Sequence, residues 1–365
     1  MAATYRARDV LRHTFAVGCN RDCQALCDYL ENRYEGKAML CKNGRSALAL
    51  ALKAYFEPGD AVIVNGFTCY AVYEAVKAAG LIPVFADIDK DNLNFSVDTL
   101  EDALKTGPNH KKPTGIIVQN SLGNPMNITA IEDFAHKYDL TIIEDLAHCV
   151  GVKYPDGREC GTVGVVAAFS FGKDKVIDTI SGGAVVFRGP TLHSVKTPSL
   201  RPRLSDHLRA RFYPLFGATC RKLTGIHLGG LLMRFLVAIH WVEKSADNRL
   251  DLKRKISKFE AKLALKQFKN LRSSGELPIR EFCLVKNREE VLKKLAHAGY
   301  YFDGIWYKQP VSPERYYKKI VFPEQDCPNS VFVTKHIINF PAYYKRECLM
   351  GAIAIVKDYV LEEEK

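Results

Sequence analysis

The chain lacks several features that would place it within a membrane or on nucleic acid. Its first ten residues carry charge but no apolar stretch, so they do not resemble a secretory signal. The most apolar segment, residues 223–242, contains Arg234 and two histidines, and a spanning helix needs about 20 largely uninterrupted apolar residues. No recognised nucleic-acid-binding motif occurs. We therefore expect a cytoplasmic protein with no nucleic-acid partner.

The cysteines do not indicate a disulfide framework or a metal centre. There are eleven, an odd number, and reduced thiols fit an intracellular compartment. Cys19, Cys23 and Cys27 recur every four residues, which places them on one face of a helix. That spacing fits a metal site or a buried stripe. The buried stripe is favoured, because no fourth ligand is suitably spaced and cysteine buries readily.

Length and composition fit an ordinary soluble protein. The 365 residues suffice for a large domain plus a smaller one, and 47% hydrophobic with 25% charged residues is typical of globular chains. The formal net charge of +11 favours anionic partners.

The stretch from Ile142 to Phe187 organises the rest of the chain. It contains three short apolar runs with polar groups at one end, which predict strands buried on both faces of a largely parallel sheet. Ligands of such α/β sheets bind beyond the carboxyl ends of the strands. Asp145 ends the first run and Lys175 follows the second, so we expect both to face one crevice. A carboxylate and a primary amine in one pocket suit pyridoxal phosphate (PLP). The carboxylate would keep the ring nitrogen protonated, and the amine would form the Schiff base.

Three motifs in this stretch resemble a known family. They are Ile143-Glu144-Asp145 with His148, then Phe169-Ser170-Phe171 with Lys175, and finally Gly182-Gly183. In this order and at about this spacing they are similar to the DegT/DnrJ/EryC1/StrS sugar aminotransferases, which are fold-type-I PLP enzymes. The resemblance covers the chain from about Lys37 to its end, apart from one long insertion.

The resemblance implies a domain plan and a reaction. We expect an N-terminal helical segment at 1–35, a large PLP-binding domain at 36–250 with a mostly parallel mixed sheet between helices, and a small α+β domain at 251–365. The family implies a homodimer that transfers an amino group, from glutamate, to a keto-sugar that is often nucleotide-linked. Related dehydratases carry histidine in place of the Schiff-base lysine, so Lys175 favours transamination.

The same resemblance implies the site. Lys175 and Asp145 are the expected catalytic residues, and Lys175 is favoured over the neighbouring Lys173 by the family spacing. The expected cofactor-binding residues are Gly44, Arg45, Ser46, Cys69, Tyr70, Asp145, His148, Ser170 and Lys175.

Several of these assignments remain open between two interpretations. The Gly44-Arg45-Ser46 turn precedes an Ala/Leu-rich helix whose N-terminus would hold the phosphate, and Arg45 would either bind that phosphate or point to solvent. The family stacks an aromatic residue on the cofactor ring where this chain has Cys69. Tyr70, one residue on, either replaces it or belongs to the core. The family's histidine near Asn120 is absent here.

The insertion at 190–246 has more than one interpretation. Its basic residues flank an aromatic, apolar stretch, a pattern typical of a helix lying on an anionic membrane. Peripheral contact through 191–242 is one hypothesis, while a lid over the active site or a contact with the partner subunit are the others. A non-catalytic, membrane-recruited scaffold is therefore the alternative to an enzyme.

The C-terminal part contains further expected elements. The pattern predicts a long amphipathic helix at 252–271, strands at 281–285, 331–333 and 337–340, and helices at 288–298 and 348–361. Trp306 and Tyr307 lie where the family has a substrate-facing loop, and they would either stack on a sugar or base or cover the seam between the domains.

Overall fold

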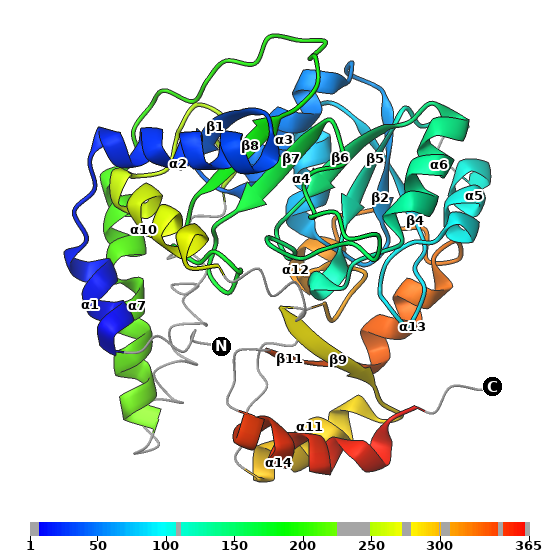
Figure 1. The fold of residues 1–365 in the computed structure, drawn as a ribbon. Helices are drawn as coiled ribbons and strands as arrows, with labels where there is room; N and C mark the ends of the chain where they lie inside the picture. Colours follow the sequence, from blue (N-terminus) through cyan, green and yellow to red (C-terminus); the bar gives the residue numbers. More distant parts are fainter. Residues whose placement is uncertain are drawn as a thin grey trace.

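The computed structural model describes residues 7–106, 111–224, 249–271, 279–298, 300, 307–341 and 346–361 (Figure 1). Its centre is a seven-stranded sheet of order β1-β8-β7-β6-β5-β2-β4. The strands are β1 (Lys37–Cys41), β2 (Ala61–Asn65), β4 (Ile82–Ala86), β5 (Gly115–Gln119), β6 (Thr141–Asp145), β7 (Val166–Ser170) and β8 (Gly183–Phe187). The predicted α/β class with a mostly parallel mixed sheet is confirmed.

The strand directions bring several strand ends to one edge. Strands β4, β2, β5, β6 and β7 pair in parallel in that order, whereas β8 runs antiparallel to both β7 and β1. The carboxyl ends of β5, β6 and β7 therefore lie side by side. Residues that follow these three strands meet there although they are far apart in the sequence.

Helices cover both faces of the sheet, so β2, β5 and β8 are buried along their whole length. In β2, Ala61 and Ile63 belong to one hydrophobic core while Val62 and Val64 belong to the other, as the two-residue period of a strand requires. Four helices pack on the first face: α2 (Asn20–Tyr34), α5 (Val97–Thr106), α6 (Ile128–Tyr138) and α10 (Lys258–Lys269). Two pack on the second: α3 (Gly44–Tyr55) and α4 (Tyr70–Ala78).

A smaller unit follows α10. Strands β9 (Arg280–Leu284) and β11 (Ile337–Pro341) form an antiparallel pair, and α11 (Arg288–His297) and α14 (Arg346–Val356) share a separate core with it (Figure 1). Helix α10 packs on α2 and contributes to the large core. The predicted domain plan stays a prediction, although α10, which follows the expected boundary at residue 250, packs on the large core.

The two units are joined by a short parallel pair, β3 (Thr68–Cys69) with β10 (Val311–Ser312). Short helical elements complete the described connections: η2 (Ser121–Gly123), α12 (Glu314–Tyr317) and η3 (Lys357–Tyr359).

Two predicted elements differ from the structure. The predicted strand at 331–333 is wrong, because these residues lie in helix α13 (Pro328–His336). Pro328 stands in its first turn, and the Asp87 carboxylate accepts hydrogen bonds from the backbone N–H groups of Asn329 and Ser330, each at 2.8 Å. The helix predicted from residue 252 begins only at Lys258. There Ser257 and Glu260 form a reciprocal capping box.

The described half of the insertion forms helix α7 (Leu204–Thr224), which packs along α1 (Ala7–Phe15) at one side of the molecule (Figure 1). Residues 225–248, including Trp241, lie outside the described residues. Within the described ranges, no helix is long and apolar enough to cross a bilayer.

Candidate active site

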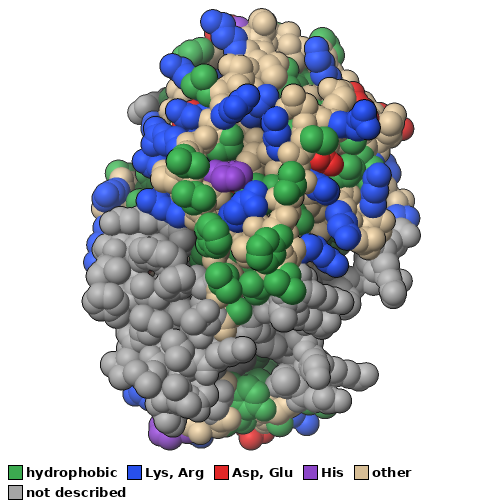
Figure 2. Space-filling view, turned by 90° about the vertical axis from the view of Figure 1, so that its left-hand side faces the viewer, with side chains coloured by type: hydrophobic (Ala, Val, Ile, Leu, Met, Phe, Trp, Pro, Cys, Tyr) green, Lys and Arg blue, Asp and Glu red, His purple; other side chains and the backbone are tan. Residues whose placement is uncertain are grey.

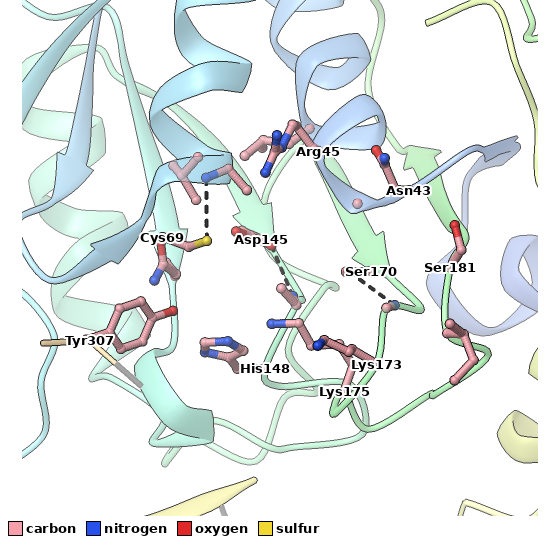
Figure 3. Close-up of a pocket in the computed structure, with 18 residues that line it drawn as sticks. Asn43, Arg45, Cys69, Asp145, His148, Ser170, Lys173, Lys175, Ser181 and Tyr307 are labelled. Carbon is pink, nitrogen blue, oxygen red and sulfur yellow. Dashed lines mark hydrogen bonds between the residues drawn. The ribbon is translucent and has the colours of Figure 1, made fainter. Parts of the chain in front are cut away.

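The carboxyl ends of β6 and β7 open on a cavity of about 220 Å³ (Figure 3). Asp145 is the last residue of β6, and Lys175 follows the turn after β7. Both side chains line this cavity. The parallel pairing of β6 with β7 is the cause, since it puts the two strand ends next to each other.

The two neighbouring acids of β6 have different surroundings. Glu144 is fully buried on the opposite face, where its carboxylate accepts hydrogen bonds from the Tyr154 hydroxyl and from backbone N–H groups of residues 161, 163 and 164, at 2.7–2.8 Å. Asp145 accepts one at 3.0 Å, from the Ala147 N–H. Burial raises the pKa of Asp145, although that hydrogen bond and the charge of Lys175 oppose the rise. A cation in the cavity would stabilise this carboxylate.

Two lysines line the cavity, in different environments. Burial lowers the pKa of Lys175, although the charge of Asp145 partly opposes the effect. A lowered pKa favours the neutral amine, which is the nucleophilic form. The Lys173 ammonium instead lies 3.5 Å from the Tyr213 hydroxyl and 5.6 Å from the centre of that ring. The two lysines thus differ in their contacts, and the covalent role of Lys175 stays a prediction.

His148 presents a neutral imidazole to the cavity. Its Nδ1 accepts a hydrogen bond from the Leu122 N–H at 3.2 Å, so the proton of the neutral ring is on Nε2. Burial lowers the pKa of His148 well below its usual value, and the charges of Lys175 and Arg280 lower it further. The Nε2–H group can thus donate a hydrogen bond without adding charge.

The N-terminus of α3 forms another part of the wall. The Asn43 side chain caps the helix by accepting a hydrogen bond from the Ser46 N–H at 2.9 Å. The N–H groups of the first two helical residues, Gly44 and Arg45, have no partner within the helix. A Cβ on Gly44 would lie 2.4 Å from the Cβ of Ser170, so only glycine lets the helix start approach the end of β7. Two backbone donors and a hydroxyl thus converge as a phosphate would require.

The side chains of Arg45 and Ser46 serve the scaffold around this turn. The Arg45 guanidinium forms an ion pair with Glu74 of α4. Ser46 does not line the cavity; its hydroxyl accepts a hydrogen bond from the Asp251 N–H at 3.1 Å. The Asn43 amide also donates to the Arg249 carbonyl at 3.1 Å. The helix start is therefore tied to the segment after the insertion.

The structure separates Cys69 from Tyr70. Cys69 lines the cavity, where its Sγ accepts a hydrogen bond from the Ala71 N–H at 3.5 Å (Figure 3). Tyr70 is not among the lining residues, and its ring stacks on Tyr316 at a centroid distance of 4.2 Å. Of the nine residues expected in the site, seven line the cavity: Gly44, Arg45, Cys69, Asp145, His148, Ser170 and Lys175.

The chain matches a known protein family over most of its length. Residues 20–347 match the DegT/DnrJ/EryC1/StrS aminotransferase family. The chain belongs to this family. Its members are PLP-dependent, and the relatives of this chain include enzymes of nucleotide-sugar amination.

The curated relatives match part of the chain. GDP-perosamine synthase of Escherichia coli O157:H7 is 34% identical over 166 residues, 45% of this chain and 44% of that protein. The dTDP-4-amino-4,6-dideoxy-D-glucose transaminase of Shigella dysenteriae is 35% identical over 161 residues, 44% of this chain and 41% of that protein. The chain thus spans about half or less of the length of these relatives.

Solved structures share the fold over nearly the whole chain. A DegT/DnrJ/EryC1/StrS aminotransferase from Brucella abortus has a TM-score of 0.66 at 21% identity, covering 96% of this chain and 93% of its own. A candidate sugar aminotransferase from Streptococcus pneumoniae, in its PLP form, has a TM-score of 0.65 at 17% identity, covering 98% and 97%. At these identities the likeness shows the fold alone.

The DegT-family cavity also contains residues that lie outside the predicted set of site residues. Gln119 ends β5 and accepts a hydrogen bond from the Thr68 hydroxyl at 2.6 Å. Its position at the carboxyl end of a parallel strand was the available signal. Tyr307, for which two roles were open, lines the cavity and packs 4.6 Å from the Phe67 ring. Asn120 is buried and bonded to the Tyr154 hydroxyl and the Met126 N–H, so it is structural.

Arg280 is a further charge beside the site that had no local sequence signal. It opens β9 in the small unit, is 1% exposed, and donates to the Asn339 side chain at 2.9 Å. Its charge lowers the pKa of both Lys175 and His148. Only the packing of the small unit against the large one brings it there.

Proposed function

We propose that this chain is a PLP-dependent aminotransferase that transfers an amino group from an amino acid, with glutamate as donor, to a keto-sugar carried on a nucleotide. The observation that carries the proposal is the shared cavity of Asp145 and Lys175 beneath the N-terminus of α3. The proposal assumes a homodimer, as in the family resemblance, and the net charge of +11 suits anionic nucleotide-sugars.

The side chains divide the work of binding and proton transfer. The Asp145 carboxylate would hold the pyridine nitrogen in its protonated form, which in turn compensates for the buried acid. The His148 Nε2–H would donate to the ring oxygen. The N–H groups of Gly44 and Arg45, with the Ser170 hydroxyl, would hold the phosphate. Bound PLP supplies an electron sink for the carbanion formed when the substrate loses a proton.

Lys175 would attach the cofactor and then move the proton. Its lowered pKa makes the neutral amine available, and it lines the same cavity as Asp145. As a general base, Nζ would take the proton from the substrate carbon and return it to the cofactor carbon. Retention of lysine at this position favours transamination over dehydration, although one relative is the GDP-4-keto-6-deoxy-D-mannose 3-dehydratase of Yersinia pseudotuberculosis.

The test is a pair of half-reactions with purified protein and PLP. The visible absorption band of the lysine-bound cofactor should appear, and it should disappear on addition of L-glutamate, with L-glutamine as the alternative donor. GDP-4-keto-6-deoxy-D-mannose and other nucleotide-linked keto-sugars are then screened for return of the band. Failure to form the band would refute the PLP assignment. A band that no donor changes would refute transamination.

A non-catalytic, membrane-recruited scaffold is the second candidate. The observation that favours it is Cys69 at the cavity face where the family resemblance places an aromatic ring. The Cys69→Tyr variant separates the two proposals. If the chain is an enzyme that functions with cysteine at this position, the wild-type protein should already complete the donor half-reaction. A scaffold should bind PLP without responding to any donor, with or without the tyrosine.

A further inference from the structure

Helix α7 carries a row of exposed apolar side chains. Leu204, Leu208, Phe212 and Leu215 recur at helical spacing and are between 43% and 72% exposed. The opposite side of the helix is in the core, where Ala210 and Tyr213 are buried with Phe259. We call the four exposed residues the α7 stripe. A helix with one face in the core and a second apolar face in solvent is unusual for a free monomer surface.

The neighbouring helix extends the apolar surface. Helix α1 packs along α7 and exposes Leu11 and Phe15, one helical turn apart, and the adjacent Val17 is also exposed. Figure 2 shows hydrophobic side chains gathered on this side of the molecule with lysine and arginine side chains around them. We call the α7 stripe together with Leu11, Phe15 and Val17 the α1–α7 surface.

The charge of the segment that contains α7 is almost entirely positive. Residues 191–224 contain seven lysines and arginines and one acid, Asp206, so these 34 residues carry six of the chain's eleven net positive charges. Asp206 is buried, within 4 Å of Lys42 and Arg249, and does not offset the charge at the surface. Arg201 and Arg203 are exposed just before α7 begins. The apolar surface is thus bordered by positive charge.

A groove of about 1000 Å³ lies beside the surface, between α2, α10 and residues 197–204. Among the described residues of its lining there is no aspartate or glutamate, and the basic side chains are Arg201, His207, Arg211, Lys255 and Lys258. The rest of the wall combines apolar side chains, among them Met39 and Leu40, with polar ones such as Asn20 and Gln24. A wall of this composition suits an anionic head group attached to an apolar chain.

Arg211 links this groove to the fold. Its guanidinium donates to the carbonyls of Thr14 and Ala16, at 2.8 and 2.9 Å, and lies over the Phe259 ring. The same residue therefore fixes α1 against α7 and presents positive charge to the groove. Exposed apolar groups and cations are held in one rigid arrangement rather than on a loose segment.

We propose that the α1–α7 surface docks on a lipid bilayer that contains anionic phospholipids, with the groove taking their head groups. Apolar side chains that enter the interface, together with a basic border, are what such binding requires. A second copy of the chain fits less well, because a two-fold contact would place two strongly positive surfaces against each other. No residue of the α1–α7 surface lines the PLP cavity, so vesicle binding and transamination are tested separately.

The test is co-sedimentation of the full-length holoprotein with vesicles of phosphatidylcholine, alone or with 30 mol% phosphatidylglycerol. Binding is expected for the anionic vesicles and should weaken steeply between low and high salt. The Leu208→Glu/Phe212→Glu variant should lose at least about tenfold in partitioning. The Arg201→Glu/Arg203→Glu variant should lose more than about 25-fold, since each basic residue contributes about fivefold.

Val321→Glu is the matched control, because Val321 is 95% exposed but lies outside the α1–α7 surface. It should bind as the wild type does. Melting curves verify that each variant is folded, and light scattering gives its mass. Equal binding to neutral and anionic vesicles, or none to either, would overturn the proposal. The proposal would also be overturned if the Leu208→Glu/Phe212→Glu variant dissociated into monomers yet bound vesicles normally. The α7 stripe would then be a contact between two copies of the chain. If the Arg201→Glu/Arg203→Glu variant bound anionic vesicles as tightly as the wild type, the proposed role of positive charge in membrane binding would be wrong.

Discussion

The cavity and the α1–α7 surface use charge in opposite ways. In the cavity, Asp145, His148 and Lys175 are removed from water, and burial is the first cause of each pKa shift. On the α1–α7 surface, exposed arginines lie beside exposed apolar side chains. A buried charge interacts strongly with one partner at a defined position. Exposed charges each contribute little, but they act together on any extended anionic partner, and salt screens them.

The largest expected effect is the loss of Lys175. Lys175→Ala should abolish the visible band of the bound cofactor and lower the donor half-reaction by at least about 10²–10⁴-fold, because the proton-transfer base is gone. Lys173→Ala is the matched control, since Lys173 lines the same cavity but lies against Tyr213. Absorbance spectra and stopped-flow traces measure both. A Lys173→Ala variant that loses the band while Lys175→Ala keeps it would reverse the assignment.

The second-largest effect is expected at Asp145, where one substitution should lower activity but raise stability. Asp145→Asn should lower turnover by roughly 10²-fold or more, because the ring nitrogen loses its partner. The PLP-free protein should instead gain stability at neutral pH. Burial raises the folded-state pKa of Asp145 above 3.8, so the buried carboxylate destabilises the fold at pH values above that folded-state pKa.

That gain should disappear as the pH falls below about 3.8, because the aspartic acid is then protonated in both the folded and the unfolded states. Urea unfolding of the PLP-free wild type and the variant, at pH 7 and near pH 3.5, measures the difference. A PLP-free variant that is less stable than the wild type at pH 7 would contradict this account of the acid.

A smaller, pH-dependent effect is expected at Arg280. Its charge lowers the pKa of Lys175, so Arg280→Met should raise that pKa and move the acid limb of the pH–rate profile to higher pH. Asn339→Ala is the control, since it removes the hydrogen-bond partner of Arg280 and keeps the charge. The profile of the donor half-reaction from pH 6 to 10 measures the shift. Equal shifts in both variants would point to lost packing rather than lost charge.

The smallest expected effect on folding is on the α7 stripe. Phe212→Ser should lower the free energy of unfolding by only about 1–2 kcal/mol, because Phe212 is 45% exposed and its ring is only partly buried. Phe169→Ala, in the fully buried ring cluster with Tyr34 and Phe268, should cost about 3–5 kcal/mol. Urea unfolding compares the two. A large loss for Phe212→Ser would show that the stripe is covered in solution.

The α/β fold and the approach of Asp145 to Lys175 could be predicted because their determinants are local. Runs of buried apolar residues define the strands, and parallel pairing then brings residues after neighbouring strands together. The prediction of a strand at 331–333 failed for the opposite reason. There Asp87, more than 240 residues away in the chain, caps the start of α13 and overrides a weak local preference.

The sequence alone determined the family motifs, the order of the strands along the chain and the excess of positive charge in the insertion, because each depends on residues close together in the chain. Only the tertiary structure decided that Cys69 rather than Tyr70 faces the cavity, that Arg280 is near enough to lower the pKa of Lys175, and that the α7 stripe is exposed. These outcomes depend on how distant elements pack, and packing is set by shape and burial over the whole molecule rather than by any local pattern.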